Sequence, residues 1–199
     1  MVNEFKTLKS TSIAEYKDRG SKFIAYASFV QNEEEALEKI KALWKEHPKA
    51  RHICYAYTLG CMHPSQRLHD DGEPTHTAAA PIANMIRKHG LHHVLVAVVR
   101  YFGGILLGKG GLIKAYGTAA EEAIKMGEFV TFSEKTTLEF TFSFEFYSKV
   151  MALLNKNSIE ILKQDFGDNC TFHVLVDVQM ADQLNNDLSS YIIIQKKPL

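Results

Sequence analysis

The sequence predicts an α+β protein with two domains, residues 1–130 and residues 131–199. The chain of 199 residues is long enough to bury two cores, and its 46% of apolar and 23% of charged residues are ordinary values for globular proteins. Segments with the two-residue period of strands alternate with segments that have the period of helices. The stretch 127–135 interrupts this register and changes the composition, so we place the domain boundary there.

The first domain is expected to contain a βαβ-type arrangement of strands and helices. The expected strands are residues 21–30, 51–60 and 93–101, of which the last is apolar enough to be central. Asn32 and Glu35 have the spacing of a helix capping box, which predicts a helix that ends before Pro48. Residues 62–74 are expected to form a polar loop. One further helix is expected to begin between residues 77 and 81 and to end at residue 90, and another is expected over residues 110–126.

The second domain is expected to have the strand and helix order βαββαβ, which is that of ferredoxin-like domains. Residues 138–146 alternate between apolar and polar side chains, as in a strand with one buried face. The remaining expected elements are a helix over 147–154, strands over 159–164 and 172–178, a helix around 184–188 and a strand over 191–195.

The net charge of zero hides an uneven distribution of charge. Residues 1–130 carry 17 basic and 14 acidic side chains, whereas residues 131–199 carry 6 and 9. Within the first domain, the 47 residues 74–120 include no Asp or Glu but hold five Lys and Arg residues. This segregation indicates either a solvated basic helix face or a surface that attracts phosphate or nucleic acid.

Several classes of protein are not expected from the sequence. The longest apolar run, residues 94–99, is far shorter than the roughly 20 residues that cross a bilayer. The first ten residues do not have the apolar core of a secretory signal. Cys54, Cys61 and Cys170 are widely spaced and odd in number, as expected of reduced thiols. We therefore expect a cytoplasmic protein without a membrane partner.

A glycine-rich segment between the last expected strand and helix of the first domain is the main candidate site. Glycines there allow close backbone approach, and a helix N-terminus with free N–H groups favours an anion. Lys109 opposes the helix dipole, so stability does not explain it, whereas a bound anion does. The expected phosphate or nucleic-acid contacts are Lys22, Arg100, Gly103, Gly104, Lys109, Gly110, Gly111, Lys114 and Tyr116.

Other interpretations of this segment remain open. Its spacing nearly matches a P-loop, but Gly110 stands where a nucleotide-hydrolysing loop needs Ser or Thr for Mg²⁺. The glycines also fit a tight turn with no ligand. Tyr101, Phe102 and Tyr116 either stack on bases or pack in the core.

The acidic loop Asp70-Asp71-Gly72-Glu73 offers a second kind of chemistry. Asp70, Asp71 and Glu73 are candidate ligands for a hard cation, although such loops are commonly just solvated. His52, Asp71 and Glu73 are candidates for general acid–base catalysis. The loop thus allows a metal-dependent hydrolase of phosphate esters or peptides, while no cofactor is expected for a binding protein.

Four motifs resemble the YigZ/IMPACT family, and in particular its bacterial two-domain branch. They lie at residues 20–25, 51–57, 70–74 and 100–117, and the last is the most specific. The resemblance implies a first domain like that of a small-subunit ribosomal protein and of domain IV of elongation factor G. It implies a second domain of the ferredoxin type, and binding to nucleic acid or the translation machinery. The eukaryotic relatives regulate translation.

The chain departs from the family pattern after the acidic loop. Where the family has Gly-Thr-Ala-Gly-Arg-Pro, this chain has His76-Thr77-Ala78-Ala79-Ala80-Pro81, so two glycines and an arginine are missing. Our hypothesis is a non-enzymatic protein that binds RNA, the ribosome or a translation factor and modulates translation. The hydrolase is the alternative, and a protein partner on the sheet of the second domain is a third possibility.

Overall fold

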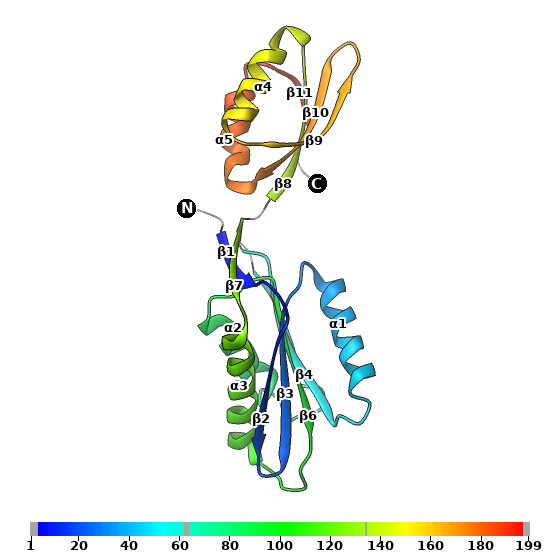
Figure 1. Cartoon of the computed structure of the whole chain (residues 1–199), viewed down its shortest axis with the longest axis vertical. Coiled ribbons are helices and arrows are strands. Elements are labelled where there is room, and N and C mark those ends of the chain that lie inside the picture. Colours follow the sequence, from blue (N-terminus) through cyan, green and yellow to red (C-terminus); the bar gives the residue numbers. More distant parts are fainter. Residues whose placement is uncertain (1–3, 62–63, 134, 197–199) are drawn as a thin grey trace. The chain divides into compact units, whose positions relative to one another are not determined.

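The computed structural model describes residues 4–61, 64–133 and 135–196. These residues form a mixed α/β protein with several sheets, divided into two compact units (Figure 1). The N-terminal unit is Phe5–Phe132, and the C-terminal unit, to which Glu4 also belongs, begins at Ser133. The expected boundary at residue 130 falls inside a strand, β7 (Phe129–Ser133), which pairs with β1 (Glu4–Leu8).

The N-terminal unit is built on a five-stranded sheet in which every neighbouring pair is antiparallel. Its strands, in spatial order, are β2 (Ser12–Asp18), β3 (Ser21–Phe29), β6 (Val94–Tyr101), β4 (His52–Leu59) and β5 (Ser65–His69). The strand β6 is central, as its apolar sequence predicts. Because β6 runs antiparallel to both β3 and β4, these two strands are parallel to each other and are linked by a helix.

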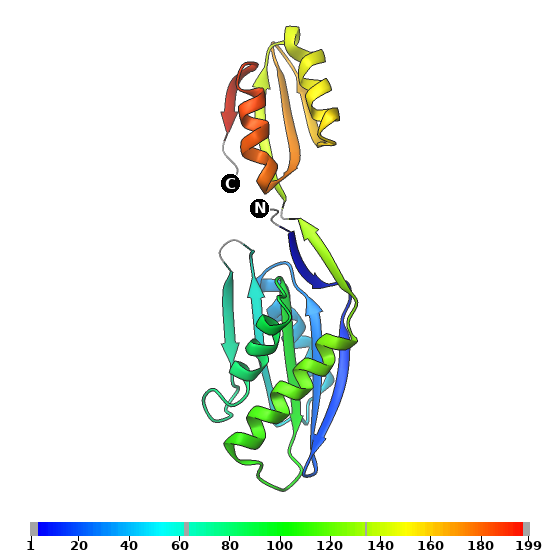
Figure 2. The same cartoon turned by 90° about the vertical axis from the view of Figure 1, so that its left-hand side faces the viewer.

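Helices cover both faces of this sheet (Figures 1 and 2). One face packs against α1 (Glu33–Glu46), and the other packs against α2 (Ala79–Lys88) and α3 (Gly108–Met126). The side chains of β6 alternate between the two cores: Val94, Val96 and Val98 face α2 and α3, while Leu95, Ala97 and Val99 face α1. Burial on both faces explains why this strand is continuously apolar.

The C-terminal unit has the element order βαββαβ that the sequence predicts. Its elements are β8 (Lys135–Phe142), α4 (Tyr147–Lys156), β9 (Glu160–Phe166), β10 (Cys170–Asp177), α5 (Val178–Leu188) and β11 (Ile192–Lys196). The strands form one antiparallel sheet in the order β11-β8-β10-β9. Its core joins alternate residues of β8 and β10, such as Phe140 and Phe172, to Val150 of α4 and Leu184 of α5.

Some element predictions were wrong. Strands β1, β2, β5 and β7 were not expected, and α3 begins at Gly108, before residue 110. The strand expected over 138–146 ends at Phe142, where the pairing with β10 and β11 also ends. Phe144 and Phe146 lie instead in a short 3₁₀ turn, η1 (Phe144–Phe146). Residues 62 and 63 of the expected loop lie outside the described residues. None of the helices within the described ranges is long and apolar enough to cross a membrane.

Candidate anion-binding site

A pocket of about 530 Å³ lies in the N-terminal unit where β6 leads into α3. It brings together residues from three of the segments singled out in the sequence. The lining residues are Arg51, His52, Glu73, Pro74, Arg100, Phe102, Leu106, Leu107, Gly108, Lys109 and Leu112. The pocket therefore combines an apolar wall with four basic side chains and one carboxylate.

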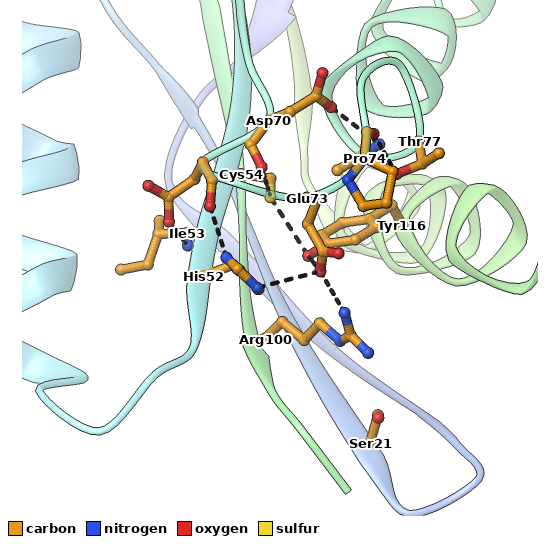
Figure 3. A network of polar contacts seen from close by, with 12 residues as sticks. Ser21, His52, Ile53, Cys54, Asp70, Glu73, Pro74, Thr77, Arg100 and Tyr116 are labelled. Carbon is orange, nitrogen blue, oxygen red and sulfur yellow. Dashed lines mark hydrogen bonds and ion pairs between the residues drawn. The ribbon is translucent and has the colours of Figure 1, made fainter. Parts of the chain in front are cut away.

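The carboxylate of Glu73 is held in a buried polar network (Figure 3). Its Oε1 accepts hydrogen bonds from Nη1 of Arg100 and from the Tyr116 hydroxyl, the latter at 2.8 Å. Glu73 is 8% exposed, Arg100 is 5% exposed and Tyr116 is fully buried. Through Arg100 of β6 and Tyr116 of α3, this network attaches the acidic loop to both elements. Loss of either member of the buried ion pair would leave an uncompensated charge, which is strongly destabilising.

This network corrects the expectation for Tyr116 and refines that for Arg100. Tyr116 does not reach a ligand, because its ring is buried against Phe23 and its hydroxyl is used by Glu73. Burial raises the pKa of its hydroxyl. Arg100 neutralises Glu73 through Nη1 but still lines the pocket, and its buried Nε has no hydrogen-bond partner among the described residues.

His52 is oriented by the acidic loop. Its Nδ1 donates to the backbone carbonyl of Asp71 at 2.6 Å, because a carbonyl oxygen can only accept. Its Nε2 then lies 3.9 Å from Oε1 of Glu73, on the pocket side. His52 and Glu73 therefore meet in one cleft, as considered for acid–base chemistry, whereas the Asp71 side chain is turned away from it.

The carboxylate of Asp71 attaches the acidic loop to the neighbouring strand β4. The amide of Ile53 donates to Oδ2 of Asp71 at 2.7 Å. Asp71 and Gly72 both have positive φ, 47° and 81°, and the Glu73 amide donates to the Asp70 carbonyl, which together make a type I′ turn. Such turns favour Asp-Gly, which gives the motif a conformational reason.

The carboxylate of Asp70 caps the N-terminus of α2. It accepts hydrogen bonds from the amides of His76, Ala78 and Ala79 at 2.8–3.1 Å. Within the described residues, no three His, Cys, Asp or Glu side chains are grouped to hold a metal ion. Asp70 and Asp71 thus have structural roles, and their role as metal ligands stays a prediction.

Two further residues of this region are structural. Cys54 is buried within hydrogen-bond distance of the Asp70 carbonyl and the Tyr116 hydroxyl. Burial raises the pKa of its thiol, so the nucleophilic thiolate is disfavoured. His76 has φ of 65°, a left-handed conformation that glycine adopts more readily, and it stands where the family pattern has glycine.

The glycines of the strand-to-helix turn fall into two groups. Gly103 and Gly111 are required by packing: a Cβ would lie 1.9 Å from the backbone carbon of Gly20 at the first and 2.9 Å from the Leu107 Cβ at the second. A Cβ on Gly104, Gly108 or Gly110 would meet nothing within 4 Å. Only the second group leaves backbone open to a ligand.

The N-terminus of α3 is uncapped by side chains, unlike those of the other two helices in this unit. Asn32 caps α1 by accepting from the Glu35 amide at 2.9 Å, and Asp70 caps α2. Leu107 precedes α3 without a side-chain hydrogen bond, and the first turn holds Lys109 but no acid. The first amides of a helix have no partner within it, so those of Gly108, Lys109 and Gly110 are available to a ligand at the start of α3, where Gly108 and Lys109 line the pocket.

The remaining predicted contacts, Lys22 and Lys114, do not line the pocket. Lys22 forms an ion pair with Glu15 of the neighbouring strand. Lys114 is exposed on α3, just beyond the first turn. Arg51 and the leucines of the apolar wall were missed, whereas Phe102 was a candidate for stacking on bases. Arg51 directly precedes His52 in its motif, whereas nothing in the sequence places Leu106 and Leu112 beside it.

The fold and this pocket define a two-unit α/β protein with a basic, partly apolar cleft at the start of a helix. Residues 19–124 match the family model for the Impact N-terminal domain, and all of the pocket-lining residues lie within that range. The chain belongs to the IMPACT family.

Relatives and a solved structure extend this likeness beyond the first unit. The IMPACT family member of Haemophilus influenzae is 33% identical over 96% of this chain and 96% of its own length. The IMPACT family member YigZ of Escherichia coli is 37% identical, over 73% of this chain and 72% of its own. A crystal structure described as a hypothetical protein is 23% identical, with a TM-score of 0.72 over 99% of this chain and 100% of that one. It shares the fold.

Proposed function

We propose that this protein binds RNA through backbone phosphates at the N-terminus of α3 and that it modulates translation in the cytoplasm as a non-enzymatic factor. The observation that carries the proposal is the uncapped start of α3, with Lys109 in its first turn, opening on the same pocket as Arg51, His52 and Arg100. Free amides, the helix dipole and basic side chains together favour a phosphate.

The neighbouring acids pair with basic side chains other than Lys109, Lys114 and Arg51, so they do not cancel the charge of these three. The acid-free stretch 74–120 is bounded by Glu73 and Glu121. Glu73 is neutralised by Arg100. Glu121 pairs with Lys88 and Lys125, and these hydrogen bonds lower its pKa to about 2. Lys109, Lys114 and Arg51 remain exposed, so this side of the unit presents basic groups to a polyanion.

The translational role rests on the family. The resemblance implies contact with nucleic acid or the translation machinery, and the basic cleft is suited to ribosomal RNA or to RNA held by a translation factor. The likeness of the N-terminal unit to a ribosomal protein and to domain IV of elongation factor G stays a prediction. So does a protein partner on the sheet of the C-terminal unit.

Salt dependence of RNA binding tests the proposal. We would titrate labelled single-stranded RNA of about ten nucleotides between about 50 and 200 mM salt. Removing one phosphate contact from a single strand reduces the slope of log K against log salt by about 0.7. We expect Lys109→Ala to show this loss.

The matched control is Lys41→Ala, an exposed lysine on α1, which covers the opposite face of the sheet. This variant should leave the slope unchanged. Equal slopes for both variants and the parent protein, or no measurable RNA binding by the parent protein, would contradict the proposal.

A further inference from the structure

We propose that the pocket receives one unpaired nucleotide, with its phosphate at the N-terminus of α3 and its base against Phe102. The inference rests on the proposed function and narrows it from RNA in general to single-stranded RNA or an unpaired end. A phosphate bound on a flat basic surface needs no cavity beside it. Here the cavity is present, with a volume of about 530 Å³, inside the range of 300–1,000 Å³ common for small-molecule sites.

A buried polar side chain independently points to a ligand in this pocket. Arg100 is 5% exposed and lines the cavity, and its Nε has no hydrogen-bond partner in the part of the chain that the structure describes. Glu73 uses only Nη1 of the guanidinium. Buried donors are normally paired, and the side chain that carries this unpaired donor lines the pocket, so we expect the Arg100 guanidinium to bind a phosphate or base oxygen of the ligand.

The wall of the pocket suits a nucleobase. Phe102 is 48% exposed, although it is a large apolar residue, and its ring lies 5.7 Å from the Arg100 guanidinium carbon. Leu106, on the same loop, is 81% exposed, and Leu112 of α3 completes the apolar surface. A base stacked on Phe102 covers this apolar area while its polar edge stays free to meet Arg51 or Arg100.

The position of the two features selects an unpaired base. Gly108 and Lys109 at the start of α3 line the same pocket as Phe102. One nucleotide can therefore place its phosphate at the N-terminus of α3 and its base on the Phe102 ring. In a duplex the bases are stacked inside the helix and only phosphates and groove edges are presented. A duplex can therefore use the helix N-terminus but not the apolar wall.

The test compares single-stranded RNA of about ten nucleotides with the same strand annealed to its complement, at one salt concentration. We expect the single strand to bind more tightly. Phe102→Leu keeps an apolar side chain but removes the ring, and it should weaken single-strand binding roughly tenfold, the effect of one stacked base, while duplex binding is unchanged. Leu106→Ser, at the most exposed position of the wall, is a second variant that should weaken the single strand alone.

The control is Phe144→Leu, at a phenylalanine of the C-terminal unit with similar exposure, 49%. It should change neither affinity. A nucleoside monophosphate should bind more tightly than inorganic phosphate at equal ionic strength, which would show that a free nucleotide shares the site.

Failure of the inference can be distinguished from failure of the proposed function. One outcome is that both RNA forms bind equally, that Phe102→Leu and Leu106→Ser have no effect, and that Lys109→Ala weakens binding of both forms. In that case the unpaired-nucleotide site is wrong, while the proposed phosphate binding is supported. If neither RNA form binds, both proposals fail. Displacement of phosphate by an acidic, apolar peptide but not by the nucleotide would overturn the inference in favour of a protein partner.

Discussion

Two loops of the N-terminal unit meet at the same pocket and use their polar groups in opposite ways. In the acidic loop, Asp70–Glu73, each carboxylate accepts hydrogen bonds from the fold itself: Asp70 and Asp71 from backbone amides, and Glu73 from Arg100 and Tyr116. In the glycine-rich turn that leads into α3, the helix amides lack a capping side chain and Lys109 is exposed.

The difference teaches which of two chemically suggestive motifs is available to a ligand. The acidic loop has the residue types of a metal site or of acid–base catalysis, but two of its three carboxylates accept hydrogen bonds from backbone amides of β4 and of the start of α2. The glycine-rich turn has few functional side chains, yet the backbone amides at the start of α3 have no capping side chain as acceptor. Whether a polar group already has a hydrogen-bond partner within the fold therefore distinguishes binding groups from structural groups better than the residue type does.

The largest expected effect comes from breaking the buried pair in the acidic loop. Glu73→Gln leaves the Arg100 guanidinium buried without a counter-charge, and we expect the free energy of unfolding to fall by about 3–5 kcal/mol. Urea denaturation followed by circular dichroism measures this loss. Glu38→Gln, at an exposed acid of α1, is the control and should change stability by less than about 0.5 kcal/mol. A loss below about 1 kcal/mol at Glu73 would contradict a structural role for the loop.

Gly103 and Gly110 should respond to alanine in opposite directions, whereas Gly104 and Gly108 have positive φ, which disfavours any side chain. Gly103→Ala places a Cβ against the Gly20 backbone, which should cost about 3 kcal/mol in the free energy of unfolding. Gly110→Ala adds a methyl group in open space on a helix and should stabilise the fold by about 0.5 kcal/mol. Thermal unfolding of the two variants provides the comparison. Similar losses at both positions would show that the whole turn is packed, with no open part.

A smaller effect is expected at the cap of α2. Asp70→Ala removes the acceptor of three amides and should lower the free energy of unfolding by about 1–2 kcal/mol, whereas Asp70→Asn, which keeps one amide oxygen, should lose less. Chemical denaturation of both variants measures the difference. Unchanged stability in Asp70→Ala would return this carboxylate to the list of groups open to a metal ion.

The smallest effect concerns Glu121, the acid at the far end of the acid-free stretch. Its ion pairs with Lys88 and Lys125 lower its pKa from 4.5 to about 2. A carboxylate whose pKa is lowered on folding stabilises the folded state at any pH above its pKa in the unfolded state. This contribution is lost as the pH falls from about 4.5 to about 2. Glu121→Gln should therefore reduce stability by less than about 1 kcal/mol at neutral pH. It should also flatten the pH dependence of the melting temperature in that window; an unchanged profile would mean that Glu121 is not neutralised.

The sequence predicted the elements whose apolar faces follow a simple period. The central strand β6 and the βαββαβ order of the C-terminal unit are examples. Strand β2 was missed because its pattern is inverted: the small residues Ser12 and Ala14 are buried, while Ile13 is half exposed. Strand β5 is exposed along its whole length, so its sequence carries no apolar signal.

The candidate site was predicted in part. The start of α3 and Lys109 could be recognised because glycines and a lysine at a helix N-terminus are unusual for stability alone. The pairing of Arg100 with Glu73 could not be foreseen, since the two residues are far apart in the chain and only the fold brings them together. For the same reason the sequence left open whether Tyr116 stacks on bases or packs in the core, where the structure places it.

The amides at the start of two helices provide the most direct test of the central claim. In a ¹⁵N-labelled sample, inorganic phosphate added at constant ionic strength should shift the amide resonances of Gly108, Lys109 and Gly110, which lack a capping acceptor. The amides of Ala78 and Ala79 already donate to Asp70 and should not move. Shifts at Ala78 and Ala79 instead, or none at the start of α3 while RNA still binds, would contradict the account.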